Sequence, residues 1–379
     1  MGCCVSVGKT AAAPHTLPER YRPPWLNGMI GNGSLLKIVG QHLRANTLPR
    51  VVFVHGPSGV GKTTLNSILE RALTCTETGE SGEPCGKCAS CQAHKAGNHP
   101  DVLRVNCGAD TGIATMRDAL AYARMYPSIS RNRVIFLDEV QGLSAAAERA
   151  LLVCLDHPPA STVFLAGSMS PDEVSKAFRD RCFSVQLKLV AVKELAAHVS
   201  KIAAHQKVPV QPPVAVAIAE AAEGVPRAAL QLLDIVLTGI RAGVQIDPEK
   251  PHEALSKLSA GTPSTMAKNA VIALYANDAS TFVRLVSKSD HAVGMIRSMI
   301  VHSASGIRFA VAGEAVFENK YAMFTAKDVH EAALKLKLSV TRRAEIGRAL
   351  EEALKLSASY NVDAASVLVH TCALLASKA

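Results

Sequence analysis

The sequence is poor in aromatic residues and has no long apolar run. Aromatic side chains make up 4% of the 379 residues. No uninterrupted apolar segment reaches the roughly 18 residues that a membrane-spanning helix needs. The longest candidate, residues 364–376, contains His370 and is interpreted as a buried helix. A membrane role is therefore not expected, and the length allows two or three domains built largely from Ala- and Leu-rich helices.

Charge of one sign is not concentrated anywhere in the chain either. The net charge is +9, but Lys and Arg are spread along the sequence. A nucleic-acid footprint and a solvated basic surface therefore both stay open. The start, Met1-Gly2-Cys3-Cys4, fits the bare pattern for N-myristoylation, but no basic cluster or apolar stretch follows it. Residues 1–16 are instead predicted to be a flexible leader.

Hydrophobic periodicity divides the rest of the chain into three parts. Residues 17–187 alternate buried-strand runs with helical segments, which predicts a parallel sheet flanked by helices. Residues 188–247 show helical spacing only, and the polar stretch 247–251 is interpreted as a linker. Helical periodicity resumes over 252–379 without a convincing strand. The expected fold is an α/β domain followed by two helical domains.

A complete phosphate-binding motif follows the apolar strand run at 51–54. It satisfies G-x-x-x-x-G-K-[ST], and the strand before it and helix after it favour function over a chance match. Its glycines let backbone N–H groups turn toward phosphate oxygens. Lys62 is expected to reach the β- and γ-phosphates, and the Thr63 hydroxyl to ligate Mg²⁺. The predicted loop comprises Gly56, Pro57, Ser58, Gly59, Val60, Gly61, Lys62, Thr63 and Thr64.

Two adjacent carboxylates, Asp138 and Glu139, end the apolar strand run 134–137. The carboxyl ends of parallel strands form the ligand-binding edge of such sheets. Asp138 is predicted to hold Mg²⁺ through water, and Glu139 to orient or deprotonate the water that attacks the γ-phosphate. Acidic pairs also cap strands merely for solubility, but a complete phosphate loop upstream favours catalysis. The glutamate favours hydrolysis over passive nucleotide binding.

Four closely spaced cysteines lie in a Gly-, Ser- and Glu-rich insert at 74–97. Their intervals of nine, two and two residues let neighbouring sulfurs converge on one ion. A closed site of four thiolates has no open position for water, so its expected role is structural. The predicted Zn²⁺ ligands are Cys75, Cys85, Cys88 and Cys91.

Two disulfides are the main alternative for these cysteines. An ATPase belongs in a reducing compartment, where disulfides do not persist. Redox catalysis is disfavoured because no thioredoxin-like βαβ context surrounds the cysteines. His94 and His99 are close to the insert but surplus to four thiolates, and we expect them at the surface.

The phosphate loop, the acidic pair and the cysteine insert, in this order, resemble the gamma/tau motor subunit of bacterial clamp loaders. The resemblance extends over roughly residues 17–240. It implies an α/β P-loop AAA+ module over 17–187, with the zinc insert at 74–97. It further implies a helical lid domain over 188–247 and a C-terminal all-α collar domain for oligomerisation over 252–379.

The resemblance implies further contacts to the nucleotide. Tyr21, Arg22 and Pro23 match a Tyr-Arg-Pro segment that lies against the nucleotide in the family. The strand run at 163–166 leads into the region where the family places its sensor-1 polar residue. Ser168 is the implied sensor, with Ser170 as the alternative.

Two arginines receive roles from the resemblance as well. Arg181 lies in Asp180-Arg181-Cys182, where clamp loaders have Ser-Arg-Cys, and is implied to act in trans on a neighbour's ATP. Asp180 replaces the family's serine and is a potential ion-pair partner of Arg181. Arg227 begins the implied sensor-2 helix and is expected to contact the γ-phosphate from the lid. A guanidinium suits both roles because it is permanently charged and forked.

The implied function is the ATP-hydrolysing motor of a sliding-clamp loader within a DNA polymerase III holoenzyme, in the cytoplasm of a bacterium or a phage-infected cell. ATP, Mg²⁺ and Zn²⁺ are the implied cofactors, with Mg²⁺ held by Thr63 and Asp138. The implied partners are other clamp-loader subunits in a hetero-oligomer (expected to be pentameric), the sliding clamp, and the backbone of primer–template DNA.

Two alternatives belong to other classes of protein. A non-hydrolysing scaffold subunit is disfavoured because Lys62, Thr63, Asp138 and Glu139 are all present. Another AAA+ DNA remodeller, such as a branch-migration motor, is disfavoured by the cysteine insert.

Overall fold

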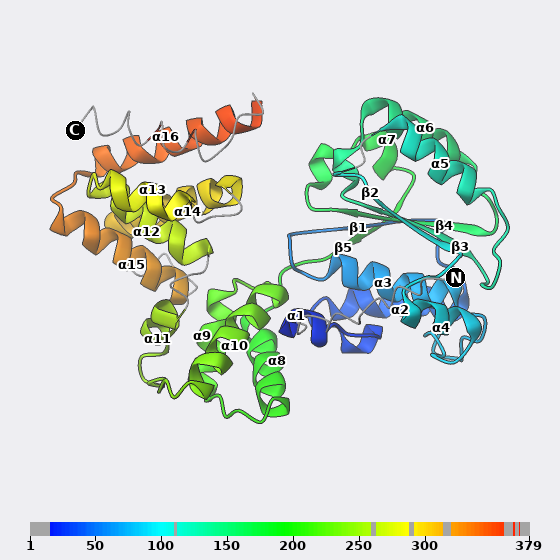
Figure 1. The fold of residues 1–379 in the computed structure, drawn as a ribbon, viewed down its shortest axis with the longest axis horizontal. Helices are drawn as coiled ribbons and strands as arrows, with labels where there is room; N and C mark the ends of the chain where they lie inside the picture. Colours follow the sequence, from blue (N-terminus) through cyan, green and yellow to red (C-terminus); the bar gives the residue numbers. More distant parts are fainter. Residues whose placement is uncertain are drawn as a thin grey trace, which may run out of the picture. The chain divides into compact units, whose positions relative to one another are not determined.

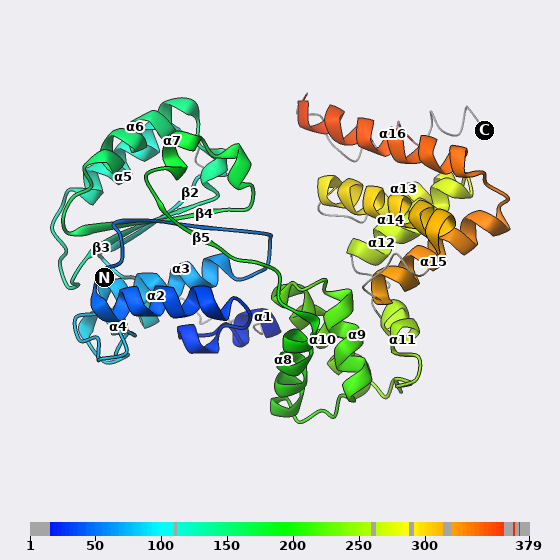
Figure 2. The same cartoon turned by 180° about the vertical axis from the view of Figure 1, so that it is seen from behind.

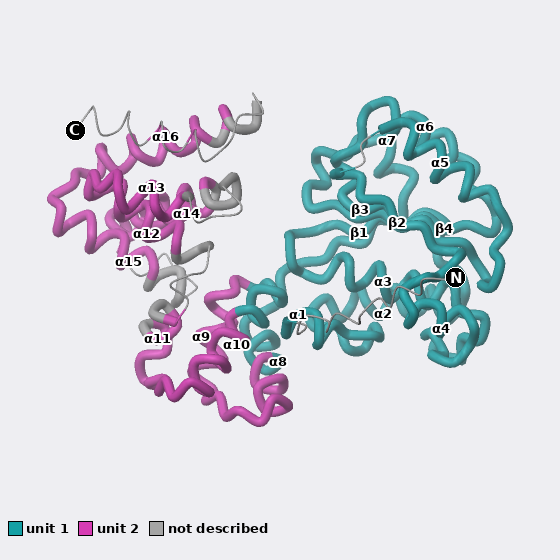
Figure 3. The backbone as a smooth tube through the Cα atoms, in the orientation of Figure 1, with its two compact units in different colours: residues 1–198, 224–231 teal, residues 199–223, 232–379 magenta. Residues whose placement is uncertain are grey.

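The computed structural model describes residues 16–109, 112–258, 263–287, 292–313 and 320–359, together with 367 and 371. The chain divides into two compact units (Figure 3). Unit 1 comprises Met1–His198 and Gly224–Gln231, and unit 2 comprises Val199–Glu223 and Leu232–Ala379. Residues 1–15 of the leader predicted over 1–16, and most of the helix predicted over 364–376, lie outside the described residues; Thr16 caps α1.

A five-stranded parallel sheet forms the centre of unit 1 (Figure 1). The strand order is β2-β3-β4-β1-β5, with β1 paired to both β4 and β5. All pairs are parallel, so the carboxyl ends of the strands meet at one edge. The strands are β1 (Val51–His55), β2 (Val102–Asn106), β3 (Arg133–Asp138), β4 (Thr162–Ser168) and β5 (Phe183–Gln186).

Helices cover both faces of this sheet because its strands are apolar on both sides. In β1, Val51 and Phe53 join one core and Val52 and Val54 the other, and β3 and β4 alternate in the same way. Helices α5, α6 and α7 lie over one face, and α2, α3 and α4 over the opposite face (Figures 1 and 2). Their bounds are α2 (Gly33–Ala45), α3 (Lys62–Thr74), α4 (Ala89–Ala96), α5 (Ile113–Ala123), α6 (Ala145–Asp156) and α7 (Lys176–Arg179).

Shorter elements complete unit 1. The helix α1 begins after Thr16, whose side chain takes part in a capping box with Glu19. The remaining elements are α1 (Leu17–Arg20), η1 (Leu26–Gly28), η2 (Val140–Gly142) and η3 (Pro171–Glu173). Two further helices contribute residues to both units, α8 (Val192–His205) and α10 (Pro226–Arg241).

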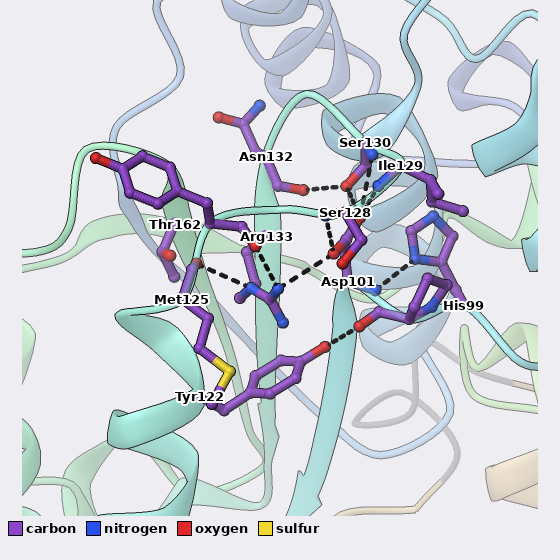
Figure 4. Close-up of polar contacts among 12 residues, drawn as sticks. His99, Asp101, Tyr122, Met125, Ser128, Ile129, Ser130, Asn132, Arg133 and Thr162 are labelled. Carbon is purple, nitrogen blue, oxygen red and sulfur yellow. Dashed lines mark hydrogen bonds and ion pairs between the residues drawn. The ribbon is translucent and has the colours of Figure 1, made fainter.

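A buried ion pair fixes the loop that leads into β3 (Figure 4). Asp101 is fully buried and accepts hydrogen bonds from the backbone N–H groups of Ser128, Ile129 and Ser130 and from the Ser130 hydroxyl. Arg133, the first residue of β3, donates to Asp101 at 3.3 Å. Burial opposes ionisation of Asp101, but these donors hold the pKa of its carboxyl below the usual value.

Arg133 also ties this loop to α5. Its guanidinium donates to the carbonyls of Met125 and Tyr126 and stacks at 4.1 Å over the ring of Tyr122. The Tyr122 hydroxyl in turn donates to the carbonyl of Pro100. The network therefore anchors β3, whose far end carries Asp138 and Glu139.

The described part of unit 2 is helical. The helix α14 packs against α12, α15 and α16, and Phe282, Met299 and Leu350 are fully buried in their shared core. An ion pair of 2.8 Å between the buried Lys268 and the partly exposed Asp328 joins α12 to α15. The helices are α9 (Pro212–Ala221), α11 (Pro251–Leu258), α12 (Pro263–Tyr275), α13 (Ala279–Ser287), α14 (Ala292–Ala312), α15 (Lys320–Lys335) and α16 (Val340–Ser359).

The parallel sheet, the helices between its strands and the helical C-terminal part are as predicted. Residues 242–250, which include most of the predicted linker, lie outside helices. The boundaries of the AAA+, lid and collar domains stay predictions. Among the described helices, none is long and apolar enough to cross a membrane.

Candidate nucleotide and metal sites

A cavity of about 610 Å³ opens at the carboxyl edge of the sheet in unit 1. It collects side chains from the entry segment, the phosphate loop, the ends of β3 and β4, and the start of α10. The predicted site residues that line it are Tyr21, Arg22, Pro23, Ser58, Gly59, Val60, Gly61, Lys62, Thr63, Thr64, Asp138, Glu139, Ser168 and Arg227. Residues widely separated in the sequence thus converge on one space.

Part of the cavity wall was missed by sequence reasoning. Met29, Ile30 and Leu230 give the cavity an apolar side, and His198 and Gln231 add polar groups. These residues come from separate segments and form no motif, so a single sequence holds no signal for them. Their mixture of apolar and hydrogen-bonding groups suits a flat heteroaromatic ring.

The phosphate loop has the backbone that its glycines predict. Gly56 and Gly61 have φ values of 145° and 108°, which are strained for residues with a side chain. A Cβ on Gly56 would lie 2.2 Å from the carbonyl oxygen of Leu187. Gly61 is the N-cap of α3, so the loop ends at a helix N-terminus, where N–H groups and the helix dipole favour an anion.

Lys62 is folded onto the loop. Its Nζ donates to the carbonyls of Gly56 and Pro57 at 2.9 and 2.8 Å. Burial lowers the pKa of the ammonium; the carboxylate of Asp138 opposes this shift and the charge of Arg227 adds to it. A phosphate group in the cavity would supply the negative charge that this buried ammonium lacks.

Asp138 and Glu139 occupy the end of β3, as predicted. Asp138 Oδ1 accepts the backbone N–H of Glu139 at 3.1 Å. Glu139 has a φ of 54°, a left-handed conformation that is uncommon outside glycine and clusters at functional sites. A second cavity of about 280 Å³, lined by Arg22 and Arg104 among others, reaches Thr63 and Asp138 from the side of β2. The two proposed magnesium ligands therefore face shared open space.

Ser168 ends β4 beside the acidic pair. Its hydroxyl donates to Gln141 Oε1 at 2.7 Å and accepts the backbone N–H of Ser170 at 3.1 Å. Ser168 lines the large cavity, and Ser170 is not among the lining residues. The geometry therefore favours Ser168 over Ser170 as the polar group facing a nucleotide.

Arg227 reaches the cavity from the first turn of α10. Its backbone N–H approaches the carbonyl of Gly59 at 3.4 Å, so α10 begins against the phosphate loop. A Cβ on Gly59 would lie 3.3 Å from the Cβ of Arg227. The small residue at this point lets the arginine come close to the loop.

Arg181 lies away from the large cavity. Its Nε and one Nη donate to both carboxylate oxygens of Asp156 at 2.6 and 3.3 Å, and the other Nη donates to the carbonyl of Ala177. Asp180, the ion-pair partner considered from the sequence, does not take these bonds. Arg181 is not among the residues that line the large cavity, and its role in trans stays a prediction.

The four cysteines of the insert converge. Their Sγ atoms all lie within 4.8 Å of one another, with Cys75–Cys88 at 3.8 Å and Cys85–Cys91 at 4.0 Å. A disulfide needs about 2.05 Å between sulfurs, whereas a tetrahedral zinc site with bonds of about 2.3 Å places them about 3.8 Å apart. The cysteines are free, and the spacing fits zinc.

Backbone N–H groups donate hydrogen bonds to the sulfurs of the insert. The N–H of Cys85 donates to Cys75 Sγ, and those of Lys87 and Cys88 donate to Cys85 Sγ, each at 3.3 Å. Burial opposes thiolate formation at Cys88, but hydrogen bonds from Thr76 and from the Cys91 backbone lower the pKa of Cys88 to about 6. Donors aimed at sulfur favour the charged ligand form.

The prediction that His94 and His99 lie at the surface is wrong for His94, and His99 is half-buried. The His94 side chain is 6% exposed, approaches the buried carboxylate of Glu70 at 3.3 Å, and bonds the Thr74 hydroxyl through Nε2. The His99 ring lies 4.2 Å from that of His94 and bonds the hydroxyl of Ser90. The His94 side chain is buried and His99 is half-buried because α4 packs on α3, a contact that the sequence does not reveal.

Glu70 joins the insert to the sheet. Arg104 of β2 donates to both of its carboxylate oxygens at 3.0 and 2.7 Å. Burial would raise the pKa of Glu70, but the hydrogen bonds from His94 and Arg104 outweigh it and lower the value. The cysteine insert, the phosphate-loop helix α3 and the edge strand β2 thus all contact one buried carboxylate.

Comparison with known proteins agrees with these features. Residues 31–191 match the family model "DNA polymerase III, delta subunit". The chain is 28% identical over 218 residues to DNA polymerase III subunit tau/gamma of Haemophilus influenzae, covering 58% of this chain and 32% of that protein. It is 29% identical to subunit tau of Escherichia coli, covering 58% and 34%, and 27% identical to subunit gamma of Buchnera aphidicola, covering 59% and 60%.

Among the solved structures that match is the Thermotoga maritima RuvB Holliday junction branch migration motor. It has a TM-score of 0.48 and 20% identity over 67% of this chain and 79% of that one. Another is the Bacillus subtilis DNA clamp loader delta protein, with a TM-score of 0.37 and 14% identity over 90% and 99%.

The predicted resemblance to the clamp-loader gamma/tau subunit is confirmed, as is the α/β P-loop AAA+ fold with a helical C-terminal part. The chain spans about a third of the length of the first two relatives.

Proposed function

We propose that this chain is the ATP-hydrolysing motor subunit of a sliding-clamp loader. The observation that supports it most is the convergence of Lys62, Thr63, Asp138, Glu139 and Arg227 on one cavity at the carboxyl edge of the sheet. A scaffold that only holds its neighbours together needs none of these groups. The resemblance of the chain to tau/gamma subunits of DNA polymerase III supports a role in DNA replication.

The residues present fit a magnesium–nucleotide complex. Lys62, already at the loop, would bind the β- and γ-phosphates, and Arg227 would contact the γ-phosphate from α10. Thr63 and Asp138 would hold Mg²⁺, which neutralises charge that develops on the phosphates. Glu139 would accept a proton from the attacking water, and Ser168 would orient that water or the γ-phosphate.

The remaining parts of the proposal concern assembly. Arg181 would complete a neighbouring subunit's site, so that hydrolysis depends on the oligomer. The four cysteines would hold a structural Zn²⁺ that shapes the insert. Contacts to primer–template DNA would be to its backbone; Arg117 and Arg124, both exposed on or just after α5, are candidates for them.

The test is ATPase activity of the chain assembled with candidate partner subunits, with and without primed DNA and sliding clamps. We expect stimulation by DNA and clamp together, and loss of turnover in Glu139→Gln with nucleotide binding retained. An assembly that binds nucleotide but never hydrolyses it would support the function of a non-hydrolysing scaffold subunit instead. Stimulation by DNA without any effect of clamps would favour another DNA-remodelling ATPase.

A further inference from the structure

Asn66 is a buried amide without hydrogen-bond partners among the described residues. Its side chain lies in the core at 1% exposure, and neither Nδ2 nor Oδ1 makes a hydrogen bond. A buried polar group without a partner costs stability, so it requires a reason beyond folding. Asn132 shows the ordinary case: it is also buried, and its amide bonds both Arg50 and the carbonyl of Leu73.

The unpartnered amide of Asn66 lies near the end of β3, where Asp138 is the proposed magnesium ligand. Asn66 lies on α3 one turn after Lys62, and α3 packs against β3 and β4. A Cβ built on Gly167 of β4 would lie 2.9 Å from Asp138 Oδ1 and 3.5 Å from Asn66 Nδ2. Gly167 has only hydrogen at this point, so carboxylate and amide flank a position that no side chain fills.

The chemistry of the two groups is complementary. The Asn66 amide offers two N–H donors and one carbonyl acceptor, and the Asp138 carboxylate accepts only. Asp138 Oδ1 receives one hydrogen bond, from the Glu139 backbone, which leaves lone pairs for a second donor. The two groups lie on either side of Gly167, so one buried water there would let an N–H of Asn66 act on the carboxylate.

We infer that Asn66 is a positioning residue for Asp138 in the magnesium–nucleotide complex. The inference rests on the proposed function, since Asp138 is a magnesium ligand only there. Asn66 holds the carboxylate in the orientation that faces Thr63, and its amide is satisfied when Mg²⁺ and nucleotide are bound. Partners of metal ligands act in this way in other sites, where their loss typically weakens metal affinity about 10- to 100-fold.

The experiment compares Asn66→Leu, an apolar replacement of similar volume, with Asn132→Leu as the matched control. Nucleotide binding is measured with a fluorescent ATP analogue during a Mg²⁺ titration and again in EDTA. The melting temperature of the nucleotide-free protein is measured in parallel. Asn66→Ser, which keeps a donor and an acceptor, serves as the conservative rescue variant.

For Asn66→Leu we expect the midpoint of the Mg²⁺ titration to rise about tenfold, the lower end of that range because Asp138 would act through water. Its binding in EDTA and its melting temperature should not fall, because the amide has no partner in the fold to lose. Asn66→Ser should lie between Asn66→Leu and the wild type. Asn132→Leu should melt lower with an unchanged Mg²⁺ midpoint, since its amide bonds are structural.

Two results overturn the inference. One is an Asn66→Leu protein with the wild-type Mg²⁺ midpoint. The other is a melting temperature lowered as in Asn132→Leu, which would show that the amide serves the fold. Wild-type protein without Mg²⁺-dependent nucleotide binding would instead refute the proposed function first, and the inference with it.

Discussion

Replacing Asp101 by Asn tests whether the buried Asp101–Arg133 pair anchors the active-site strand (Figure 4). The side chains of Asp101 and Arg133 are 0% and 4% exposed. Removing one member of a buried pair leaves the other charge uncompensated and typically costs about 3–5 kcal/mol. That is a large part of the roughly 5–15 kcal/mol by which domains are stable. Asn keeps one acceptor oxygen for the 128–130 backbone, so we expect about 3 kcal/mol.

The measurement is urea unfolding followed by the fluorescence of Trp25, the chain's only tryptophan, which lies in unit 1. Ser130→Ala removes one of the donors to Asp101 and should cost about 1.5 kcal/mol or more, the usual range for hydrogen bonds to charged groups. Asp118→Asn on α5 is the matched control; Asp118 is exposed, so its change should stay within about 0.5 kcal/mol. A loss below about 1 kcal/mol for Asp101→Asn would refute the anchoring role.

The same variant has a pH signature. The pKa of Asp101 is lower in the folded protein than in the unfolded chain, so ionised Asp101 stabilises the fold above its unfolded pKa. This contribution is lost as the pH falls through the folded value. The difference in unfolding free energy between the wild type and Asp101→Asn should therefore be constant near neutral pH and shrink below about pH 4. A difference that is independent of pH would mean that the charge of Asp101 does not matter.

Three further outcomes are expected. Lys62→Ala should abolish nucleotide binding in equilibrium dialysis, because the cavity loses its buried ammonium; unchanged affinity would contradict the phosphate-loop assignment. Metal analysis should find about one zinc per chain in the wild type and none in the double variant Cys85→Ser, Cys88→Ser, and zinc retained by that variant would remove the four-thiolate site. Arg181→Ala should leave binding of ATP by its own chain intact while lowering turnover of the assembly, and normal turnover would exclude a trans role.

The sequence predicts those parts of the molecule that local chemistry determines. A β-branched run followed by glycines and a lysine specifies β1, the loop and the start of α3, because turn, strand and helix signals agree over a few residues. The acidic end of β3 and the cysteine spacing are equally local. Parallel pairing then brings the ends of β3 and β4 beside the loop, since carboxyl ends share one edge.

What the sequence does not reveal depends on contacts between distant segments. No sequence motif marks Glu70, yet its carboxylate is buried between the sheet and the insert, where it contacts Arg104 and His94. Asn66 fits the polar spacing of a helix, and only packing of α3 under β4 shows that its amide is enclosed. Asp156 as the partner of Arg181 is hidden for the same reason, because 25 residues separate them.

The ion pair between Arg181 and Asp156 shows how an arginine that acts on a neighbouring subunit can be held in place before it is used. The guanidinium is held by three hydrogen bonds, two of them to Asp156, and that contact lowers the pKa of the Asp156 carboxyl. An ion pair open to solvent contributes little to stability because water and salt screen it. Asp156 therefore orients the Arg181 side chain, and little free energy is needed to break their contact. A triphosphate on a neighbouring subunit carries more negative charge than one carboxylate and can compete for the guanidinium. On this reasoning Asp156→Asn should leave the stability of the chain nearly unchanged, and its effect should be confined to the turnover of the assembly.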